Sequence, residues 1–252
     1  MIREWKTPGG DYSLLFADCL KQHNLLIAGE CGSGKSVFEN GLMYTALLLN
    51  SPCKVGFILL DPKLTELIAY KDLPHTIMYA NGNNGKMMVN ALKQAVAIIM
   101  ARNAEMARKR VKTYEGSDIY VIIDELADLM TTHRKEAFPL LQRIAQIGRA
   151  AKVHLIACTQ SPISKIIPTE LKCNFTSRIG LRTISRQDSR NILDMAGCEL
   201  FPEPAIEHKA YCYYRRNGSI DKYIVPYTKE EEINRVIEHW MKNRKGKLKL
   251  FG

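Results

Sequence analysis

The segment Gly29–Ser36 constrains the fold of this chain more than any other part of its sequence. It reads GECGSGKS and fits the pattern G-x-x-x-x-G-K-[ST], whose glycines permit a loop with its backbone N–H groups pointing at phosphate oxygens. An apolar run at 25–28 precedes the segment and a helical pattern at 35–49 follows it, so the positive end of a helix dipole adds to the same place. The sequence therefore predicts a phosphate-binding loop between a buried strand and a helix.

The chemistry of this loop predicts a site for ATP with Mg²⁺. Lys35 would reach the β- and γ-phosphates, and the hydroxyl of Ser36 would ligate Mg²⁺. Glu30 is unusual in such a loop, because a carboxylate beside phosphates is a like-charge neighbour. Its side chain either points away, meets a cation, or faces the nucleotide and weakens binding. We expect the nucleotide contacts to come from Gly29, Glu30, Cys31, Gly32, Ser33, Gly34, Lys35, Ser36 and Val37.

A second candidate segment is the apolar run 119–123, which ends in two carboxylates about ninety residues after the loop. This spacing favours a neighbouring strand. Asp124 would hold the Mg²⁺, directly or through water, and Glu125 would accept a proton from the attacking water. The glutamate favours an ATPase that hydrolyses its nucleotide over a kinase or a switch GTPase. Gln160 ends the next apolar run, where it could contact the γ-phosphate and the attacking water and report hydrolysis to the following loop.

Short β-branched runs alternate with longer helical patterns, which is typical of an α/β fold with a mostly parallel sheet flanked by helices. We expect strands at 25–28, 55–60, 76–80, 119–123, 153–158 and 178–182, and helices at 35–49, 86–112, 138–151 and 187–196. Residues 161–175 hold two prolines and indicate a long loop with one short helical turn at most. The runs 210–215 and 223–227, on either side of Asn217-Gly218, predict a C-terminal β-hairpin, and a last helix begins at Thr228.

The chain shows no domain boundary between residues 20 and 245. We expect an N-terminal extension at 1–22, one ATPase domain at 23–245 and a basic tail at 246–252. The formal net charge of +10 favours anionic partners.

The seven cysteines form no C-x-x-C pair, which favours reduced thiols in a cytoplasmic protein over a zinc site or a disulfide framework. No apolar run approaches the ~20 residues that span a bilayer. We therefore expect that any recruitment to the inner face of a membrane depends on a partner.

Several motifs taken together resemble the FtsK/SpoIIIE family of DNA translocases, within the wider HerA/FtsK group. The similarity runs from about His23 to Trp240, with order and spacing in agreement throughout. Its segments are GECGSGKS at 29–36, LDPK at 60–63 with Glu66-Leu67 and Pro74-His75, DELADLM at 124–130, IAQIGRAA at 144–151, HLIACTQ at 154–160 with Pro162, and DSRNILD at 188–194. The resemblance implies a RecA-like P-loop NTPase sheet, a ring homo-oligomer of six subunits, ATP sites between subunits and DNA in the central pore.

Such a ring needs a positive charge from the neighbouring subunit to stabilise the charge of the transition state. Arg102 matches a family arginine in the helix before the second acidic strand, and we favour it as this arginine finger. Arg149, Arg178 and Arg190 match family arginines as well. Arg149 and Arg190 would equally suit a role in bracing the fold or the subunit interface.

The loop after Gln160 would face the pore. Lys165 and Lys172 would touch DNA phosphates there, a kind of contact that positions DNA without reading its sequence. The lysines of the C-terminal tail would bind nucleic acid or remain solvated: Lys242, Lys245, Lys247 and Lys249.

We therefore expect an ATPase, stimulated by DNA, that moves along double-stranded DNA. The chain departs from the family in Glu30, and it carries no membrane segment, long linker or winged-helix domain, so we expect a phage, plasmid or conjugative origin. One alternative is a coupling ATPase that docks on a conjugation or secretion channel, with a membrane-channel or relaxase partner, and moves single-stranded DNA or protein. Another is a nucleotide-dependent scaffold that hydrolyses ATP weakly.

Overall fold

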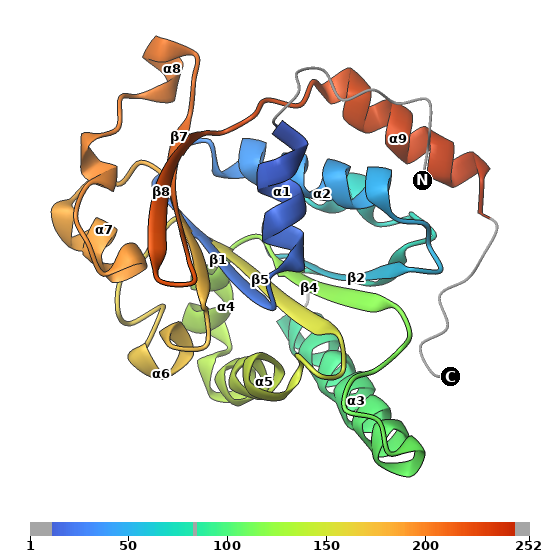
Figure 1. Ribbon diagram of the computed structural model, residues 1–252. Helices are drawn as coiled ribbons and strands as arrows, with labels where there is room; N and C mark the ends of the chain where they lie inside the picture. The colour runs from blue at the N-terminus through green and yellow to red at the C-terminus, as the bar shows by residue number, and fades with distance from the viewer. Residues whose placement is uncertain (1–11, 83–84, 245–252) are drawn as a thin grey trace.

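The computed structural model describes residues 12–82 and 85–244, so the predicted basic tail at 246–252 lies outside the described residues. One sheet of eight strands runs through the described part in the order β3-β2-β4-β5-β1-β6-β7-β8 (Figure 1). The strands are β1 (Asn24–Ala28), β2 (Val55–Asp61), β3 (Thr76–Asn81), β4 (Asp118–Ile123), β5 (Val153–Thr159), β6 (Ser177–Gly180), β7 (Tyr211–Arg216) and β8 (Ser219–Ile224).

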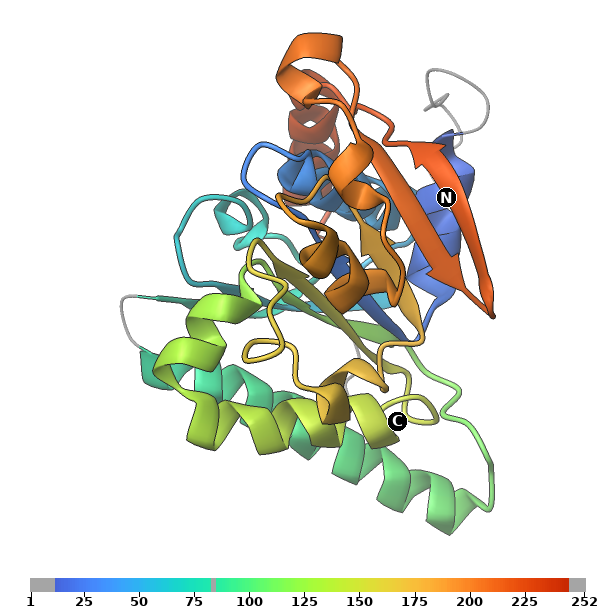
Figure 2. The same cartoon turned by 90° about the vertical axis from the view of Figure 1, so that its left-hand side faces the viewer.

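The first six strands pair in parallel, and β7 and β8 join antiparallel at one edge, where Figure 2 shows the hairpin. β1, β2 and β5 are buried along their whole length and β4 is buried after its first residue, which explains why these strands consist of near-continuous apolar residues. The predicted α/β fold with a mostly parallel sheet and a C-terminal hairpin is confirmed.

Helices cover both faces of the sheet (Figure 1). One face packs against α1 (Tyr12–Lys21), α2 (Lys35–Leu49) and α9 (Glu230–Lys242). The other packs against α3 (Gly85–Lys109), α4 (Leu126–Thr132) and α5 (Arg134–Ile147). Successive strand residues alternate between the two cores, as Leu25 and Leu26 do. Both faces of the central strands are therefore buried in apolar cores, and most of the polar residues of these strands lie at the strand ends.

Three short helices lie near β6 in the chain. The helix α6 (Thr169–Lys172) precedes this strand, and α7 (Arg186–Leu193) and α8 (Pro204–Glu207) follow it. The helix α6 is the single short turn that the sequence allowed in the loop after Gln160. Two 3₁₀ turns complete the described elements, η1 (Ile68–Tyr70) and η2 (Cys198–Leu200).

The helix α4 is absent from the sequence-based prediction, which placed one helix at 138–151 after the second acidic strand. The structure has two helices there, and the second begins at Arg134 and ends at Ile147. The side chain of Glu125 caps α4 by accepting a hydrogen bond from the backbone N–H of Ala127 at 3.3 Å. A helix of seven residues is too short for its apolar periodicity to be read from sequence.

The second strand of the hairpin begins at Ser219, four residues before the predicted start at Tyr223. Asn217 and Gly218 both have positive φ angles, 48° and 84°, so the strands pair directly on either side of a two-residue turn. The prediction missed this start because β8 is a largely exposed edge strand with polar residues.

Residues 12–21, which the sequence assigned to an extension before the ATPase domain, form α1. Phe16 of this helix is buried and packs edge-on against Phe38 of α2, with ring centroids 5.1 Å apart. This helix therefore contributes to the core of the sheet's first face. Within the described ranges, no helix has the length and apolar character needed to cross a membrane.

Candidate nucleotide site

The phosphate-binding segment lies in the turn between β1 and α2, at the carboxyl end of the parallel strands. Gly32 and Gly34 have φ angles of 76° and 95°, in the left-handed region that residues with a side chain rarely adopt. A Cβ atom on Gly34 would also lie 2.6 Å from the Cβ atom of Ala210. Glycine is therefore required here, and the turn leads into the first turn of α2, whose N–H groups can bind an anion.

Lys35 is the first residue of α2, and its side chain is buried. Its Nζ lies 2.5 Å from Oδ1 of Asp124 and donates to the Asp124 carbonyl oxygen at 3.2 Å. Burial opposes the charge of the ammonium, but the neighbouring acidic groups of Cys158, Glu39 and Asp124 outweigh it and raise the pKa of Lys35. Lys35 therefore keeps its positive charge, as a phosphate-binding lysine must.

Glu39, one turn further along α2, is a carboxyl group that the sequence did not single out. It is 1% exposed, and neither of its oxygens accepts a hydrogen bond from a described residue. Its Oε2 lies 3.9 Å from Nζ of Lys35. Burial, followed by the charge of Asp124, raises the pKa of Glu39 well above its usual value. Asp124 is thus the carboxylate that balances the charge of Lys35.

The hydroxyl of Ser36 donates to Oε1 of Glu66 at 2.7 Å. Glu66 comes from the loop after β2, which Asp61 holds in place by accepting from the backbone N–H groups of Thr65 at 3.2 Å and Leu67 at 3.1 Å. The sequence brought Glu66 into the family motif but gave it no role, because the packing of the loop after β2 against the first turn of α2 is not visible in the sequence.

These groups fit Mg²⁺, which prefers hydroxyl, carboxylate and phosphate oxygens. Lys35 contacts Asp124 and the next residue, Ser36, contacts Glu66, so two carboxylates flank the start of α2. At the start of α2, the predicted ligand Asp124 thus lies beside Lys35, and the predicted ligand Ser36 lies beside the carboxylate of Glu66.

Glu125, the predicted base, is 3% exposed and is held by several donors. Its Oε1 accepts from the hydroxyl of Thr159 at 2.8 Å, and both oxygens accept from the backbone N–H of Gln160, at 3.1 and 3.2 Å. The ammonium of Lys63 lies 3.6 Å from Oε2. The structure thus brings Glu125 to the start of the loop that follows β5, beside the predicted sensor Gln160.

Glu30 meets a cation, which is one of the alternatives open for this residue. Its carboxylate forms an ion pair with the guanidinium of Arg182, and its backbone N–H donates to the Arg182 carbonyl oxygen at 2.9 Å. Arg182 follows β6, so the pair ties the phosphate-binding loop to the neighbouring strand. The partner offsets the like-charge penalty that an unpaired carboxylate would impose on phosphates.

A hollow of about 690 Å³ adjoins the phosphate-binding loop. Gly32, Gly34 and Val37 form one wall, and the opposite side comes from the segment around α8 and from the residues after β8, including Tyr227. Tyr227 is 74% exposed. Most residues that line the hollow are apolar, with His208, Lys209 and Tyr227 among them, and its volume suits a base and ribose.

The structure contradicts the prediction that Arg102 is an arginine finger. Arg102 is fully buried, and one of its guanidinium nitrogens donates to the carbonyl oxygens of Ser117 at 2.9 Å and Ala151 at 2.8 Å. The guanidinium carbon also lies 4.2 Å from the centroid of the Tyr114 ring. A side chain enclosed in its own subunit cannot reach the nucleotide of a neighbour.

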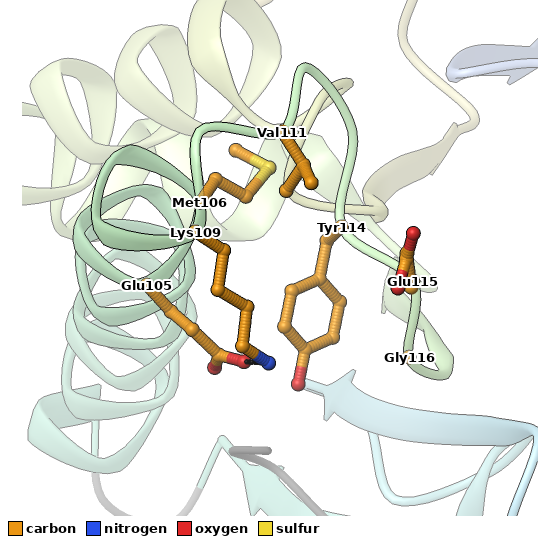
Figure 3. Close-up of a pocket in the computed structure, with 7 residues that line it drawn as sticks. All are labelled: Glu105, Met106, Lys109, Val111, Tyr114, Glu115 and Gly116. Carbon is orange, nitrogen blue, oxygen red and sulfur yellow. Dashed lines mark hydrogen bonds and ion pairs between the residues drawn. The ribbon is translucent and has the colours of Figure 1, made fainter.

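Figure 3 shows Tyr114 in a second pocket, of about 210 Å³, at the end of α3. Glu105, Lys109 and Tyr114 point into this pocket, and the ion pair between Glu105 and Lys109 spans 2.5 Å. The loop that lines it leads into the amino end of β4, whereas the nucleotide site lies at the carboxyl ends. This pocket and Arg102 therefore belong to the end of the sheet opposite to Lys35.

The other three arginines that match family arginines differ in how exposed their side chains are. Arg178 is buried and donates to Oδ2 of Asp194 at 2.7 Å, so it braces the fold. Arg149 and Arg190 have exposed side chains. Arg149 lies just before the amino end of β5, beside a depression of about 570 Å³ that it lines with Gln146 and others. It is thus available to a neighbouring molecule.

The two predicted DNA contacts also differ. Lys165 is exposed on the loop after β5. Lys172 has its Nζ 2.5 Å from Oδ1 of Asp194, and this side chain is 18% exposed. Burial alone would raise the pKa of Asp194, but the hydrogen bonds from Lys172 and Arg178 and the charges of these two residues outweigh it and lower this pKa to about 2. The placement of Lys172 argues for a structural role and against a contact with DNA.

Comparison with known proteins adds to this geometry. The model of the FtsK/SpoIIIE family matches residues 10–120 and 114–164. The chain is 35% identical over 236 residues to a protein named DNA translocase FtsK from Campylobacter jejuni subsp. jejuni serotype O:23/36, which covers 88% of this chain and 24% of the relative. A protein of the same name from Haemophilus influenzae is 32% identical over 264 residues, with coverages of 90% and 49%. The chain thus spans about a quarter to a half of the length of these curated relatives.

Among solved structures, the chain is similar to the cytoplasmic domain of the type VII secretion ATPase EccC of Thermomonospora curvata. The TM-score is 0.74 at 20% identity, and the match covers 86% of this chain and 28% of EccC. At this identity the likeness supports the fold, which is the RecA-like P-loop ATPase fold that the sequence predicted.

Proposed function

The chain belongs to the FtsK/SpoIIIE family of P-loop ATPases, and on that premise we propose that it hydrolyses ATP to move double-stranded DNA through a ring of identical subunits. One observation carries the proposal: Lys35 after β1 and Asp124 and Glu125 after β4 lie together at the carboxyl edge of the sheet, beside a hollow large enough for a nucleoside. The sequence predicted that these two strands are neighbours, but β5 lies between them. The proteins named DNA translocase FtsK support the direction of the proposal, since they are 31–38% identical to this chain.

The contacts of the site suggest how its residues act. Phosphates compete with Asp124 for the ammonium of Lys35, and binding would transfer this hydrogen-bond donor from the carboxylate to the nucleotide. Bound Mg²⁺ would neutralise charge on the phosphates and be held by Ser36 and Asp124. Glu125 would take a proton from the attacking water, and Gln160 would orient that water.

The hollow beside the loop would take the base and ribose of ATP. Its wall from Gly32 to Val37 adjoins the phosphate site, and Tyr227 provides an exposed ring on the other side. An aromatic ring can pack against a purine in an offset-stacked or edge-to-face arrangement. This assigns the segment after β8 to nucleotide binding.

We propose Arg149 in place of Arg102 as the arginine finger. Its side chain is exposed and stands at the amino end of β5, while the phosphate-binding loop follows the carboxyl end of the parallel strand β1. The length of a strand separates the two ends, so Arg149 would act on the nucleotide of another copy. This geometry supports a ring in which each ATP site is completed by a neighbour, with six subunits as the family suggests.

The pore contact would come from Lys165, and the net charge of +10 would assist binding of any DNA sequence. We further propose a cytoplasmic location, with recruitment to a membrane only through a partner. An origin in a phage, plasmid or conjugative element stays a prediction, as does a channel or relaxase partner.

The test is the ATPase rate with and without long double-stranded DNA, for the wild type and for Glu125→Gln. We expect DNA to stimulate the wild type and Glu125→Gln to lose about 10²- to 10⁴-fold in turnover, the usual contribution of a general base. Binding of ATP to Glu125→Gln should persist, because this residue does not hold the phosphates.

Other outcomes select among the alternatives. Stimulation by single-stranded DNA alone would favour a coupling ATPase of a conjugation channel. Tight binding of ATP with negligible turnover in the presence of either DNA would favour a nucleotide-dependent scaffold, and would contradict the motor.

A further inference from the structure

Thr159 lies between the catalytic carboxylate and the loop that would face DNA. It is the last residue of β5, and its side chain is fully buried. Its hydroxyl donates to Oε1 of Glu125 at 2.8 Å and accepts from the backbone N–H of Ser161 at 3.1 Å. Ser161 is the first residue of the loop that carries Lys165. A single hydroxyl thus joins the base to the start of this loop.

The two carboxylate oxygens of Glu125 have different hydrogen-bond partners. Oε1 accepts from the Thr159 hydroxyl, from the N–H of Gln160 at 3.1 Å and from the N–H of Ala127 at 3.3 Å. Oε2 has the more distant Gln160 N–H at 3.2 Å and the Lys63 ammonium at 3.6 Å. Oε1 is therefore the anchored oxygen, and Oε2 retains capacity to accept a proton from water.

The donors of Oε1 come from different places. The N–H of Ala127 belongs to α4, which follows Glu125 directly, so it moves with the glutamate. Thr159 ends β5, and Gln160 follows it directly. Of these two, the hydroxyl of Thr159 also accepts from the backbone of the loop itself. A displacement of Ser161 would therefore change the hydrogen bond that orients the base.

We propose that Thr159 is a positioning residue that couples the occupancy of the 161–172 loop to the orientation of Glu125. The inference rests on the proposed function, because it takes Glu125 as the base and this loop as the DNA contact. DNA on the loop shifts Ser161, and the Thr159 hydroxyl passes the shift to Oε1. Turnover then depends on DNA through this hydroxyl, and affinity for ATP does not.

The test compares Thr159→Val, which keeps the shape and removes the hydroxyl, with Thr159→Ser, which keeps the hydroxyl. We measure kcat and KM for ATP with and without long double-stranded DNA. In Thr159→Val the ratio of stimulated to basal kcat should fall about tenfold, the order expected from losing one hydrogen bond to a carboxylate. KM for ATP should stay within about twofold of the wild type, and Thr159→Ser should restore the ratio.

Thr45→Val is the matched control. Thr45 is also buried, and its hydroxyl donates to the Gly41 carbonyl oxygen at 2.8 Å in α2. It should lower stability without changing the stimulation ratio. A wild-type ratio in Thr159→Val, or an equal loss in Thr159→Ser or Thr45→Val, would overturn the inference alone. A wild type whose rate ignores DNA would overturn the proposed function and this inference with it.

Discussion

Glu66 accepts a hydrogen bond from the hydroxyl of Ser36, which is a predicted ligand of Mg²⁺. This one side chain would therefore affect how the metal is held. The distance from Ser36 Oγ to Glu66 Oε1 is 2.7 Å, and the other oxygen of Glu66 accepts from Asn40 at 3.5 Å. Asn40 in turn accepts from the hydroxyl of Tyr70 at 2.6 Å. This chain of contacts orients Ser36 from outside the set of predicted metal ligands.

We predict that Glu66→Gln raises the Mg²⁺ concentration for half-maximal ATPase activity by about 10- to 100-fold, the usual effect of removing a group that supports a metal ligand. The measurement is a Mg²⁺ titration at saturating ATP. Asp72→Asn, which removes an exposed carboxylate further along the same connection, is the control. An unchanged titration in Glu66→Gln would show that this carboxylate does not support the metal.

Residues whose chemistry is tied to a local motif could be found from the sequence, and residues brought in by packing could not. Lys35 and Asp124 were both found from their motifs, although the contact between them was not predicted. Arg102 was misassigned because the assignment rested on its match to a family arginine, which does not show whether the side chain is exposed. Its spacing held the correct signal, since it falls four residues after Ile98 and four before Met106, both buried on α3.

At the scale of elements, His75 links the start of β3 to α9. It is fully buried, its ring stacks on Phe57 at 5.8 Å, and it meets Trp240 edge-on at 5.0 Å. One ring nitrogen lies 3.2 Å from the Asn50 carbonyl oxygen. Burial lowers the pKa of His75 to about 4. The contact between these elements therefore requires a neutral imidazole.

The pH dependence of stability follows from this shift. Unfolded chains take up a proton on His75 below about pH 6.5, whereas the folded chain resists it down to about pH 4. The stabilisation that neutral His75 gives to the folded chain is therefore complete above pH 6.5 and is lost as the pH falls toward 4. The free energy of unfolding should fall when the pH is lowered from 7.5 to 5. We predict that this fall is about 2 kcal/mol smaller in His75→Gln than in the wild type.

Urea denaturation at both pH values measures this difference, and the exposed His208→Gln serves as the control. His23, whose pKa burial also lowers to about 4, contributes in the same window in every variant. Equal pH dependence in His75→Gln and the wild type would contradict the prediction.

Strands and long helices were predictable because their burial is periodic or continuous. The bounds of α2 agree with the sequence, since its apolar face repeats over fifteen residues. α4 and the first part of β8 were missed, because a seven-residue helix capped by Glu125 and a polar edge strand carry no such pattern. Their positions depend on a side-chain cap and on a turn with two positive φ angles.

At the scale of the whole molecule, the nucleotide site and Arg149 lie at opposite ends of the sheet. We predict that Lys35→Ala and Arg149→Ala are each nearly inactive alone, the latter by about 10³-fold or more if it is the finger. An equal mixture should regain activity at about a quarter of its interfaces, where an intact loop meets an intact arginine. The measurement is DNA-stimulated ATPase activity of mixed and separate variants.

Arg190→Ala, which removes the other exposed family arginine, is the comparison for this experiment. A normal rate in Arg149→Ala alone would exclude Arg149 as the finger. If both variants are inactive alone and their mixture stays inactive as well, Arg149 does not act on the nucleotide of a neighbour. The opposition of the two ends follows from the predicted parallel sheet, since the loop follows β1, Arg149 precedes β5, and these strands pair in parallel. The exposure of Arg149 was not predictable from sequence, because it depends on the packing around the residue.

That opposition has a consequence for how copies associate. A contact that joins the loop end of one copy to the Arg149 end of the next is heterologous, since the two surfaces differ, and a two-fold axis cannot generate it. Each further copy is related to the one before it by the same rotation. The assembly becomes a ring if this rotation closes, and an open filament if it does not. A closed assembly of this kind has two unlike faces, so a duplex threaded through it would experience a polarity that its own near-symmetric backbone lacks.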